Sequence, residues 1–179
     1  MPVLPPPITS RTNARVKALR ASLSGEARRP GDLLGLEGLK LMGEVHKGSG
    51  RFETVYVREG SEALLEEGWP REIQSRTWAL LSPEVFDAAV ETRSPQGIAA
   101  TWTIPDAEPK PLDGCMLVME NLQDPGNVGT LIRTAEAFGC GVMATPATAN
   151  EWNPKVVRAS AGSVLRLSLI HISEPTRPY

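Results

Sequence analysis

The sequence predicts an α/β protein, because short apolar segments with strand character alternate with segments of helical periodicity. The clearest strand is the apolar run CMLVM at 115–119, and a strongly periodic helix, NVGTLIRTAEAF, follows it after one short loop. A third observation concerns the stretch 103–113, TIPDAEPKPLD, which has three prolines and no periodicity and is expected to be a linker. The chain is therefore predicted to contain two α/β parts.

The first part is predicted to cover residues 9–102, after a loose Pro-rich start at 1–8. Thr9 or Ser10 is a suitable N-cap for a helix that runs to about residue 23, with Val16, Leu19 and Leu23 facing inward. Alternation and helix-start residues predict strands at 33–37, 52–57, 77–81 and 97–102, and helices at 39–47, 61–67 and 82–90.

In the second part, the strand predicted at 115–119 is followed by a turn and a helix. Residues 124–126, Asp-Pro-Gly, cannot continue a strand, so the backbone is expected to turn there. A helix then begins near Asn127 as N-cap and stops at Phe138, with Gly139 in a left-handed conformation. The helical spacing predicts one apolar face, made by Val128, Leu131, Ala135 and Phe138. The adjoining face is polar and is made by Asn127, Thr130 and Arg133.

After this helix the pattern predicts a buried strand at 140–144, a polar loop at 145–152, a helix at 153–162 and a strand at 164–167. The two cysteines, Cys115 and Cys140, lie in apolar runs, so buried reduced thiols are expected rather than a disulfide or a metal site. Lys155 and Arg158, in the later helix, are interpreted as surface charges, with contact to RNA phosphate as the alternative.

The composition is that of an ordinary globular protein of 179 residues, with 41% hydrophobic and 22% charged residues. It has no apolar run of membrane-spanning length and no secretory signal pattern, so we expect a cytoplasmic protein. The net charge of −2 hides an asymmetry: residues 1–51 hold nine Lys and Arg against four Asp and Glu. The first predicted helix region carries four basic side chains, which are Arg11, Arg15, Lys17 and Arg20. They are expected to bind a polyanion such as RNA, and the alternative is that they form a solvated helix face.

The stretch 121–139, NLQDPGNVGTLIRTAEAFG, carries a specific pattern, N-x-x-x-P-x-N-x-G-x-x-x-R-T-A-x-x-F-G. This pattern resembles the first signature motif of the SpoU/TrmH family of RNA 2′-O-ribose methyltransferases, in the SPOUT superfamily. Looser similarity to the family extends over ITSRTNARVKALRASL, LLGLEGLKLMGEV and SPQGIAAT in the first part, and over NPKVVRASAGSVLRL in the second. Glu37-Gly38 is interpreted as a strand-to-helix junction without chemistry.

The resemblance implies a fold and a division of labour. Residues 9–102 would be a ribosomal-protein-like α/β domain that grips RNA, most plausibly rRNA, with tRNA as the alternative. Residues 114–166 would be the N-terminal part of a SPOUT domain, the α/β knot that binds S-adenosyl-L-methionine and forms a homodimer in the family. It also implies that Arg133 works at the ribose hydroxyl and that Asn127 organises the loop and the substrate around it.

Chemistry restricts what Arg133 can do. A guanidinium has donors and no acceptor, so it is a poor general base, but its fork suits two oxygens of a phosphate or an oxyanion. We therefore assign Arg133 to orientation and charge stabilisation and leave the general base open. The competing interpretation is a structural Arg133 paired with a carboxylate such as Glu136.

Two expectations concern the end of the chain. The family's Gly-Asn-Glu-x-x-Gly and Ser-Leu-Asn-Val motifs do not occur in the sequence, so no cofactor ligand is assigned. The string LSLIHISEPTRPY at 167–179 is expected to form neither helix nor strand and resembles a translated sequencing adapter, which suggests a truncated and inactive methyltransferase. The alternative function is a non-catalytic RNA-binding module. A dinucleotide-dependent oxidoreductase is less well supported, because Gly126 and Gly129 give only G-x-x-G.

Overall fold

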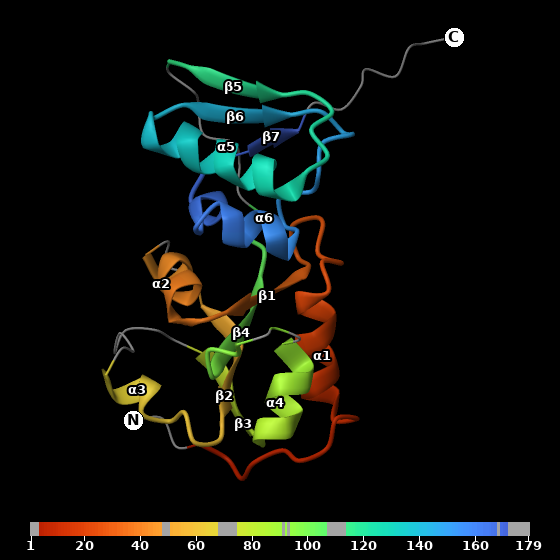
Figure 1. Ribbon diagram of the computed structural model, residues 1–179, viewed down its shortest axis with the longest axis vertical. Coiled ribbons are helices and arrows are strands. Elements are labelled where there is room, and N and C mark those ends of the chain that lie inside the picture. Colours follow the sequence, from red (N-terminus) through yellow and green to blue (C-terminus); the bar gives the residue numbers. More distant parts are fainter. Residues whose placement is uncertain are drawn as a thin grey trace. The chain divides into compact units, whose positions relative to one another are not determined.

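The computed structural model describes residues 4–47, 51–67, 75–90, 92, 94–106, 114–167 and 169–171. The chain divides into two compact units, Met1–Pro105 and Asp106–Tyr179, and each is described here by itself (Figure 1). The division falls within the stretch expected to be a linker, of which residues 107–113 lie outside the described part. Among the described helices, none has both the length and the apolar character needed to cross a membrane.

Unit 1 contains a four-stranded mixed sheet in the order β1-β4-β2-β3. The central strand β4 runs antiparallel to both of its neighbours, whereas β2 and β3 are parallel. Every predicted strand is confirmed within two residues, and the observed bounds are β1 Leu33–Glu37, β2 Phe52–Arg58, β3 Ser75–Leu81 and β4 Ile98–Thr103. Ile98, Ala99 and Ala100 are all fully buried, as expected for a strand with a neighbour on each side and helices over both faces.

Helices cover both faces of this sheet: α1 and α4 pack together on one side, and α2 lies on the other (Figure 1). Their bounds are α1 Ala14–Leu23, α2 Leu39–Lys47, α3 Leu64–Glu67 and α4 Pro83–Val90. The first helix begins later than predicted, because the side chain of Asn13 accepts the Arg15 N–H and caps it, rather than Thr9 or Ser10. Val16 and Leu19 are buried as predicted.

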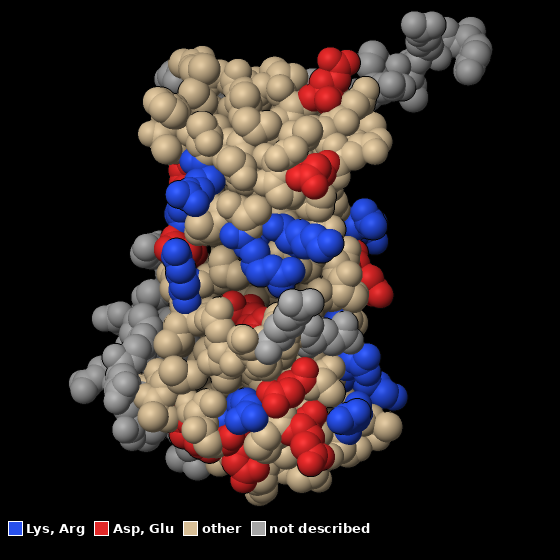
Figure 2. All heavy atoms as spheres, in the orientation of Figure 1, with Lys and Arg blue, Asp and Glu red and all other residues tan. Residues whose placement is uncertain are grey.

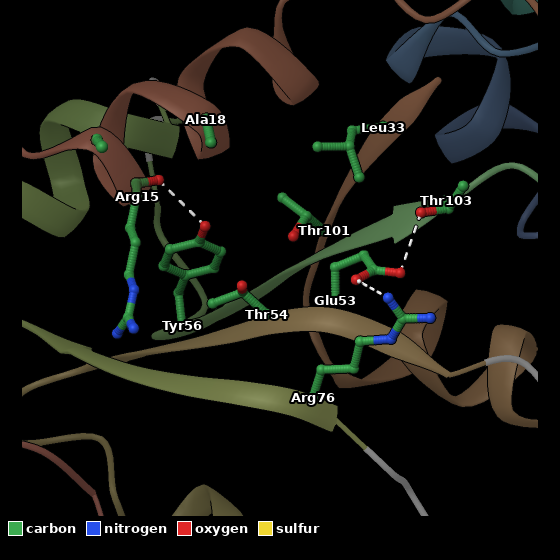
Figure 3. Close-up of a pocket in the computed structure, with 10 residues that line it drawn as sticks. Arg15, Ala18, Leu33, Glu53, Thr54, Tyr56, Arg76, Thr101 and Thr103 are labelled. Carbon is green, nitrogen blue, oxygen red and sulfur yellow. Dashed lines mark hydrogen bonds and ion pairs between the residues drawn. The ribbon is translucent and has the colours of Figure 1, made fainter. Parts of the chain in front are cut away.

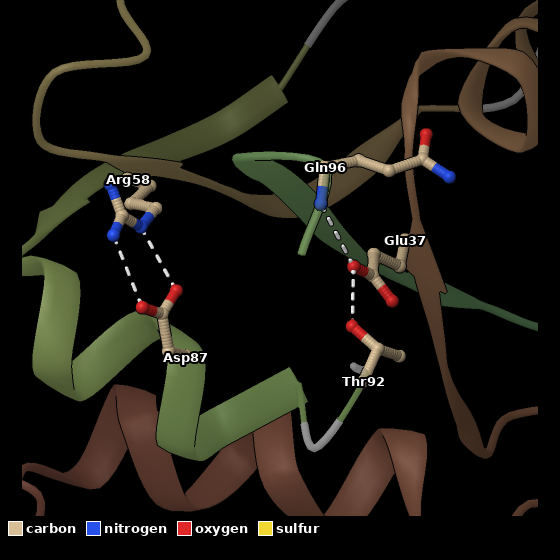
Figure 4. Close-up of polar contacts among 5 residues, drawn as sticks. All are labelled: Glu37, Arg58, Asp87, Thr92 and Gln96. Carbon is tan, nitrogen blue, oxygen red and sulfur yellow. Dashed lines mark hydrogen bonds and ion pairs between the residues drawn. The ribbon is translucent and has the colours of Figure 1, made fainter. Parts of the chain in front are cut away.

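The Glu37-Gly38 junction has a structural explanation. Gly38 adopts a φ of 89°, and a Cβ there would collide with the Gln96 side chain. The Glu37 carboxylate accepts hydrogen bonds from the Thr92 hydroxyl and from the Gln96 N–H, each at 3.1 Å (Figure 4). The junction thus fixes the loop before β4.

A bidentate ion pair joins β2 to α4. The Arg58 guanidinium donates to the two carboxylate oxygens of Asp87 at 2.9 and 3.1 Å (Figure 4). Hydrogen bonding with Arg58 holds the pKa of Asp87 below its ordinary value. Because both side chains are partly exposed, the pair orients α4 on the sheet and contributes little to stability.

Unit 2 contains a parallel three-stranded sheet in the order β5-β6-β7, with α5 packed on it and α6 packed on α5 (Figure 1). Its elements are β5 Met116–Met119, α5 Pro125–Ala137, β6 Gly141–Ala144, α6 Pro154–Ala159, the 3-10 helix η1 Ser163–Leu165 and β7 Leu169–His171. The strands at 115–119 and 140–144 and the loop between β6 and α6 agree with the sequence analysis.

Two expectations near the end of unit 2 are wrong. The predicted strand at 164–167 is replaced by η1, because the left-handed Gly162 turns the chain and the Ser163 N–H bonds back to Ser160. The stretch after residue 167 was expected to form no strand, yet β7 pairs in parallel with β6. The alternation of LSLIHI favours a strand once a neighbouring edge is available.

The helix predicted at 153–162 ends earlier, at Ala159.

The helix α5 also departs from prediction at its ends. It begins at Pro125 rather than near Asn127, because Asp124 is the N-cap and accepts the Asn127 N–H at 2.7 Å. Its end is as predicted, with Gly139 at a φ of 66°. Phe138, expected on the apolar face, is 79% exposed, and Ile132 is buried instead.

Gly129 allows α5 and α6 to approach closely. It is buried, and a Cβ at this position would lie 2.6 Å from the Ala159 Cβ and 2.7 Å from the Val156 carbonyl oxygen. The second contact involves backbone, which cannot rotate away. Gly129 is therefore a packing residue of the α5–α6 interface.

We expect Gly129→Ala to reduce the free energy of unfolding by about 1–3 kcal/mol, because α6 must shift to admit the methyl group. Urea unfolding followed by circular dichroism measures this change. Gly43→Ala is the matched control: Gly43 lies inside α2 with open space around its Cβ position, so it should gain about 0.5–1 kcal/mol. Equal stability of the two variants would contradict the close approach.

Candidate functional site

The candidate site of unit 2 lies where β5 and β6 end. The two strands are parallel and in register, so the loops that follow them leave the sheet at the same edge. Ligands of open α/β sheets bind at this edge. One loop, 120–124, leads into α5 and the other, 145–153, leads into α6.

A reciprocal contact joins the two loops. Asn121 adopts a left-handed φ of 53°, a conformation that Asn tolerates better than most residues. Its N–H donates to the Thr145 hydroxyl oxygen at 3.0 Å, and that hydroxyl donates to the Asn121 side-chain oxygen at 3.3 Å. The sequence analysis missed Thr145, although its place directly after a buried strand was a usable signal.

Three further hydrogen bonds extend this connection. The Thr145 N–H and the Thr148 hydroxyl both donate to the Met119 carbonyl oxygen, at 3.0 and 3.2 Å. The Ala149 N–H donates to the Leu122 carbonyl oxygen at 2.8 Å. The loop before α5 is consequently held by the loop after β6, and the start of α5 is fixed with it.

The predicted polar residues of α5 are all exposed: Asn127, Thr130 and Arg133. The Thr130 hydroxyl donates to the Gly126 carbonyl oxygen at 2.8 Å, so it is occupied within the helix. Asn127 lies in the first turn, beside the loops, and Arg133 lies six residues further along. Both residues are exposed and lie outside the buried face of α5.

The competing interpretation of Arg133 named Glu136 as its partner. Glu136 is instead paired with Arg166, whose guanidinium donates to both carboxylate oxygens at 2.6 and 2.7 Å. This pair ties α5 to the segment after η1. Glu136 is therefore the partner of Arg166. Arg133 is exposed.

The basic residues proposed to bind RNA in unit 1, Arg11, Arg15, Lys17 and Arg20, are all exposed. Figure 2 shows Lys and Arg side chains grouped on the side of unit 1 that carries α1, next to an acidic area. They do not form one face, because the buried Val16 and Leu19 place Arg15 at the margin of the sheet and Lys17 toward solvent.

A groove of about 520 Å³ lies between α1 and the sheet (Figure 3). Arg15 lines one end, and its guanidinium approaches the Trp78 carbonyl oxygen at 3.5 Å. Arg76, which the sequence analysis did not single out, lines the other end and pairs with Glu53 at 3.1 Å. Tyr56 forms part of the floor and donates to the Arg15 carbonyl oxygen at 3.1 Å. Burial raises the pKa of Tyr56, so its phenol stays neutral.

Potential metal-ligating side chains are dispersed in the described part of the chain. No cluster of three or more His, Cys, Asp or Glu is found among them. No buried side-chain N or O atom in this part lacks a hydrogen-bond partner.

Comparison with known proteins finds relatives in sequence and in structure. The pattern of the SpoU rRNA Methylase family matches residues 114–177. An uncharacterized tRNA/rRNA methyltransferase of Synechocystis is 37% identical over 89% of this chain, and the 23S rRNA (guanosine(2553)-2′-O)-methyltransferase RlmP of Bacillus subtilis is 30% identical over 94%. A crystal structure of an RNA 2′-O ribose methyltransferase matches 93% of the chain with a TM-score of 0.73 and 26% identity. The chain spans 60%, 66% and 66% of the lengths of these three proteins.

The parallel sheet, with α5 packed on it and two loops joined at its carboxyl edge, defines an α/β fold that matches RNA 2′-O ribose methyltransferase structures. The chain belongs to the SpoU/TrmH family of RNA 2′-O-ribose methyltransferases. The family match continues through residue 177, so the expectation that the resemblance stops near residue 167, with a truncated chain, is not supported.

We expect Thr145→Val to weaken the connection between the loops, because it keeps the shape of the side chain and removes the hydroxyl. The free energy of unfolding should fall by about 0.5–1.5 kcal/mol. Amide hydrogen exchange at Asn121 should accelerate, since its N–H loses its partner. Thr145→Ser keeps the hydroxyl and should behave like the wild type. Identical exchange in the Val and Ser variants would show that the hydroxyl does not hold the loop.

Proposed function

We propose that the protein methylates the 2′-hydroxyl of an RNA ribose in rRNA, with S-adenosyl-L-methionine as methyl donor. Membership of the SpoU/TrmH family supports this proposal. The single observation that carries it is the exposed Arg133 on α5, within the signature stretch and on the helix whose start is held by the joined loops. S-adenosyl-L-methionine supplies the methyl group; its ligands are not assigned.

In this proposal Arg133 holds the substrate still and stabilises charge. Methyl transfer needs the ribose oxygen in line with the methyl group and a fixed neighbouring phosphate. The guanidinium can donate two parallel hydrogen bonds to phosphate oxygens or to the developing oxyanion. Asn127, in the first turn of α5, would orient the loop and the sugar. The general base stays unassigned, because a guanidinium is suited to donating hydrogen bonds rather than to accepting a proton.

We also propose a division of labour between the two units. Residues 9–102 would be the ribosomal-protein-like RNA-binding domain, and residues 114–166 would belong to the SPOUT α/β knot domain. The basic residues of α1 support the first assignment, and Arg15 has the added feature of lining the groove of unit 1. The parallel sheet with its site at the carboxyl edge supports the second.

The proposal predicts that Arg133→Ala lowers the rate of RNA 2′-O-methylation by about 10²–10³-fold, because it removes a charged donor from the transition state. Transfer of radiolabelled methyl from S-adenosylmethionine to purified rRNA measures the rate. Arg158→Ala removes an equal charge from the exposed surface of α6 and should stay within about twofold of the wild type. Undiminished methylation by the Arg133 variant would refute the assigned role.

The second candidate function is an RNA-binding module without catalysis, which the basic surface of α1 favours. The two functions agree on RNA binding and differ on methyl transfer. Both require RNA binding, but only the first requires transfer of a methyl group. A wild-type protein that binds rRNA and transfers no methyl group would favour the module.

For RNA binding we expect Arg15→Ala to weaken affinity about three- to tenfold and to lower the slope of log K against log salt by about one. Filter binding over a range of KCl concentrations measures both quantities. Lys40→Ala is the matched control, since Lys40 is an exposed cation on α2, which covers the other face of the sheet. An equal loss in both variants would indicate a diffuse charge effect and contradict a role specific to α1.

A further inference from the structure

The two cysteines are neighbours across the sheet of unit 2, and the expectation that their thiols are buried is wrong, because Cys115 is exposed and Cys140 is partly exposed. Met116 is opposite Gly141 in the parallel register, so the preceding residues, Cys115 and Cys140, are also opposite each other. The Gly141 N–H donates to the Cys115 carbonyl oxygen at 2.9 Å, so the hydrogen bonds between β5 and β6 extend to Cys115. Residues opposite each other in parallel strands point to the same face.

The geometry of this pair suits a disulfide. Neighbouring strands lie about 4.8 Å apart, and disulfides span Cα separations of about 4.4–6.8 Å. Both cysteines are free; Cys115 is exposed and Cys140 is partly exposed. The Cys140 thiol approaches the Phe138 carbonyl oxygen at 3.8 Å, and its hydrogen bond with the Cys115 thiol, together with desolvation, raises its pKa.

We propose that Cys115 and Cys140 form a dithiol site that reacts with small disulfides such as oxidised glutathione and closes to an intramolecular disulfide. The site lies at the amino ends of β5 and β6, whereas the candidate site for RNA lies at their carboxyl ends. The bond therefore fixes the register of the two strands without touching Asn127 or Arg133. This proposal does not depend on the proposed function.

The reaction is balanced by the external disulfide. The thiolate of Cys115, the more exposed thiol, attacks oxidised glutathione, forms a mixed disulfide and releases one glutathione thiolate. Cys140 then loses its proton to water and attacks the Cys115 sulfur, which releases the second glutathione. The two protein thiols give up two electrons, and the external disulfide is reduced to two thiols.

Mass spectrometry of the dilute protein, equilibrated with oxidised and reduced glutathione and quenched in acid, tests the proposal. The wild type should lose two hydrogen atoms in mass, and its digest should contain one peptide pair that joins Cys115 to Cys140. Cys115→Ser and Cys140→Ser should instead carry one glutathione at the remaining thiol. A wild type that accumulates two glutathione adducts, joins only between molecules or stays reduced would overturn the proposal.

A second measurement avoids oxidation. Phenylarsine oxide binds two close thiols at one arsenic atom, so the reduced wild type should bind it at least about 100-fold more tightly than either serine variant, through the second arsenic–sulfur bond. Circular dichroism checks that the serine variants remain folded, as expected for substitutions at accessible positions. Equal affinity in all three proteins would show that the thiols do not act together.

Discussion

The parallel pairing of β5 with β6 is the constraint on which unit 2 depends. Because the strands run in the same direction, whatever follows them meets at one edge and whatever precedes them meets at the other. At the carboxyl edge this brings Asn121 to Thr145, and at the amino edge it brings Cys115 to Cys140. The candidate functional site and the dithiol pair are therefore two consequences of one register.

The helix between these strands carries the exposed arginine. Val128 and Ile132 face the core and are fully buried, and Gly129 allows α6 to lie directly against the backbone of α5. Once that face is buried, the helical period leaves Arg133 outward. Arg166 holds Glu136, so the charge of Arg133 is available for an anionic substrate rather than for an ion pair with Glu136. Packing on one side of α5 thus determines the chemistry available on the other.

In unit 1 the buried face of α1 likewise determines where its basic side chains lie, and they point in different directions. Burial of Val16 and Leu19 fixes the rotation of α1, and the Tyr56 hydroxyl holds the backbone at Arg15. Arg15 consequently lies at the groove, where Arg76 is the second cation, while Lys17 points away from the sheet. A phosphate backbone would meet these charges in sequence along the surface rather than on one flat face.

Sequence alone determined the elements that local physics controls. Buried strands such as β1 and β6 have continuous apolar runs, and the end of α5 is marked by Gly139, so their positions could be predicted within one or two residues. The signature stretch likewise singled out Asn127 and Arg133. The N-cap of α5 was missed by three residues, because Asp124 competes with Asn127 as a cap and Pro125 favours the earlier start.

Only the tertiary structure decided which distant residues meet. Nothing local to Thr145 reveals a bond to Asn121, which is 24 positions away, and nothing local to Arg76 reveals the groove. The exposure of Phe138 and the pairing of β7 likewise depend on which faces and edges find neighbours. Propensity and periodicity act over a few residues, whereas hydrogen bonds between loops and between strands are fixed by the fold as a whole.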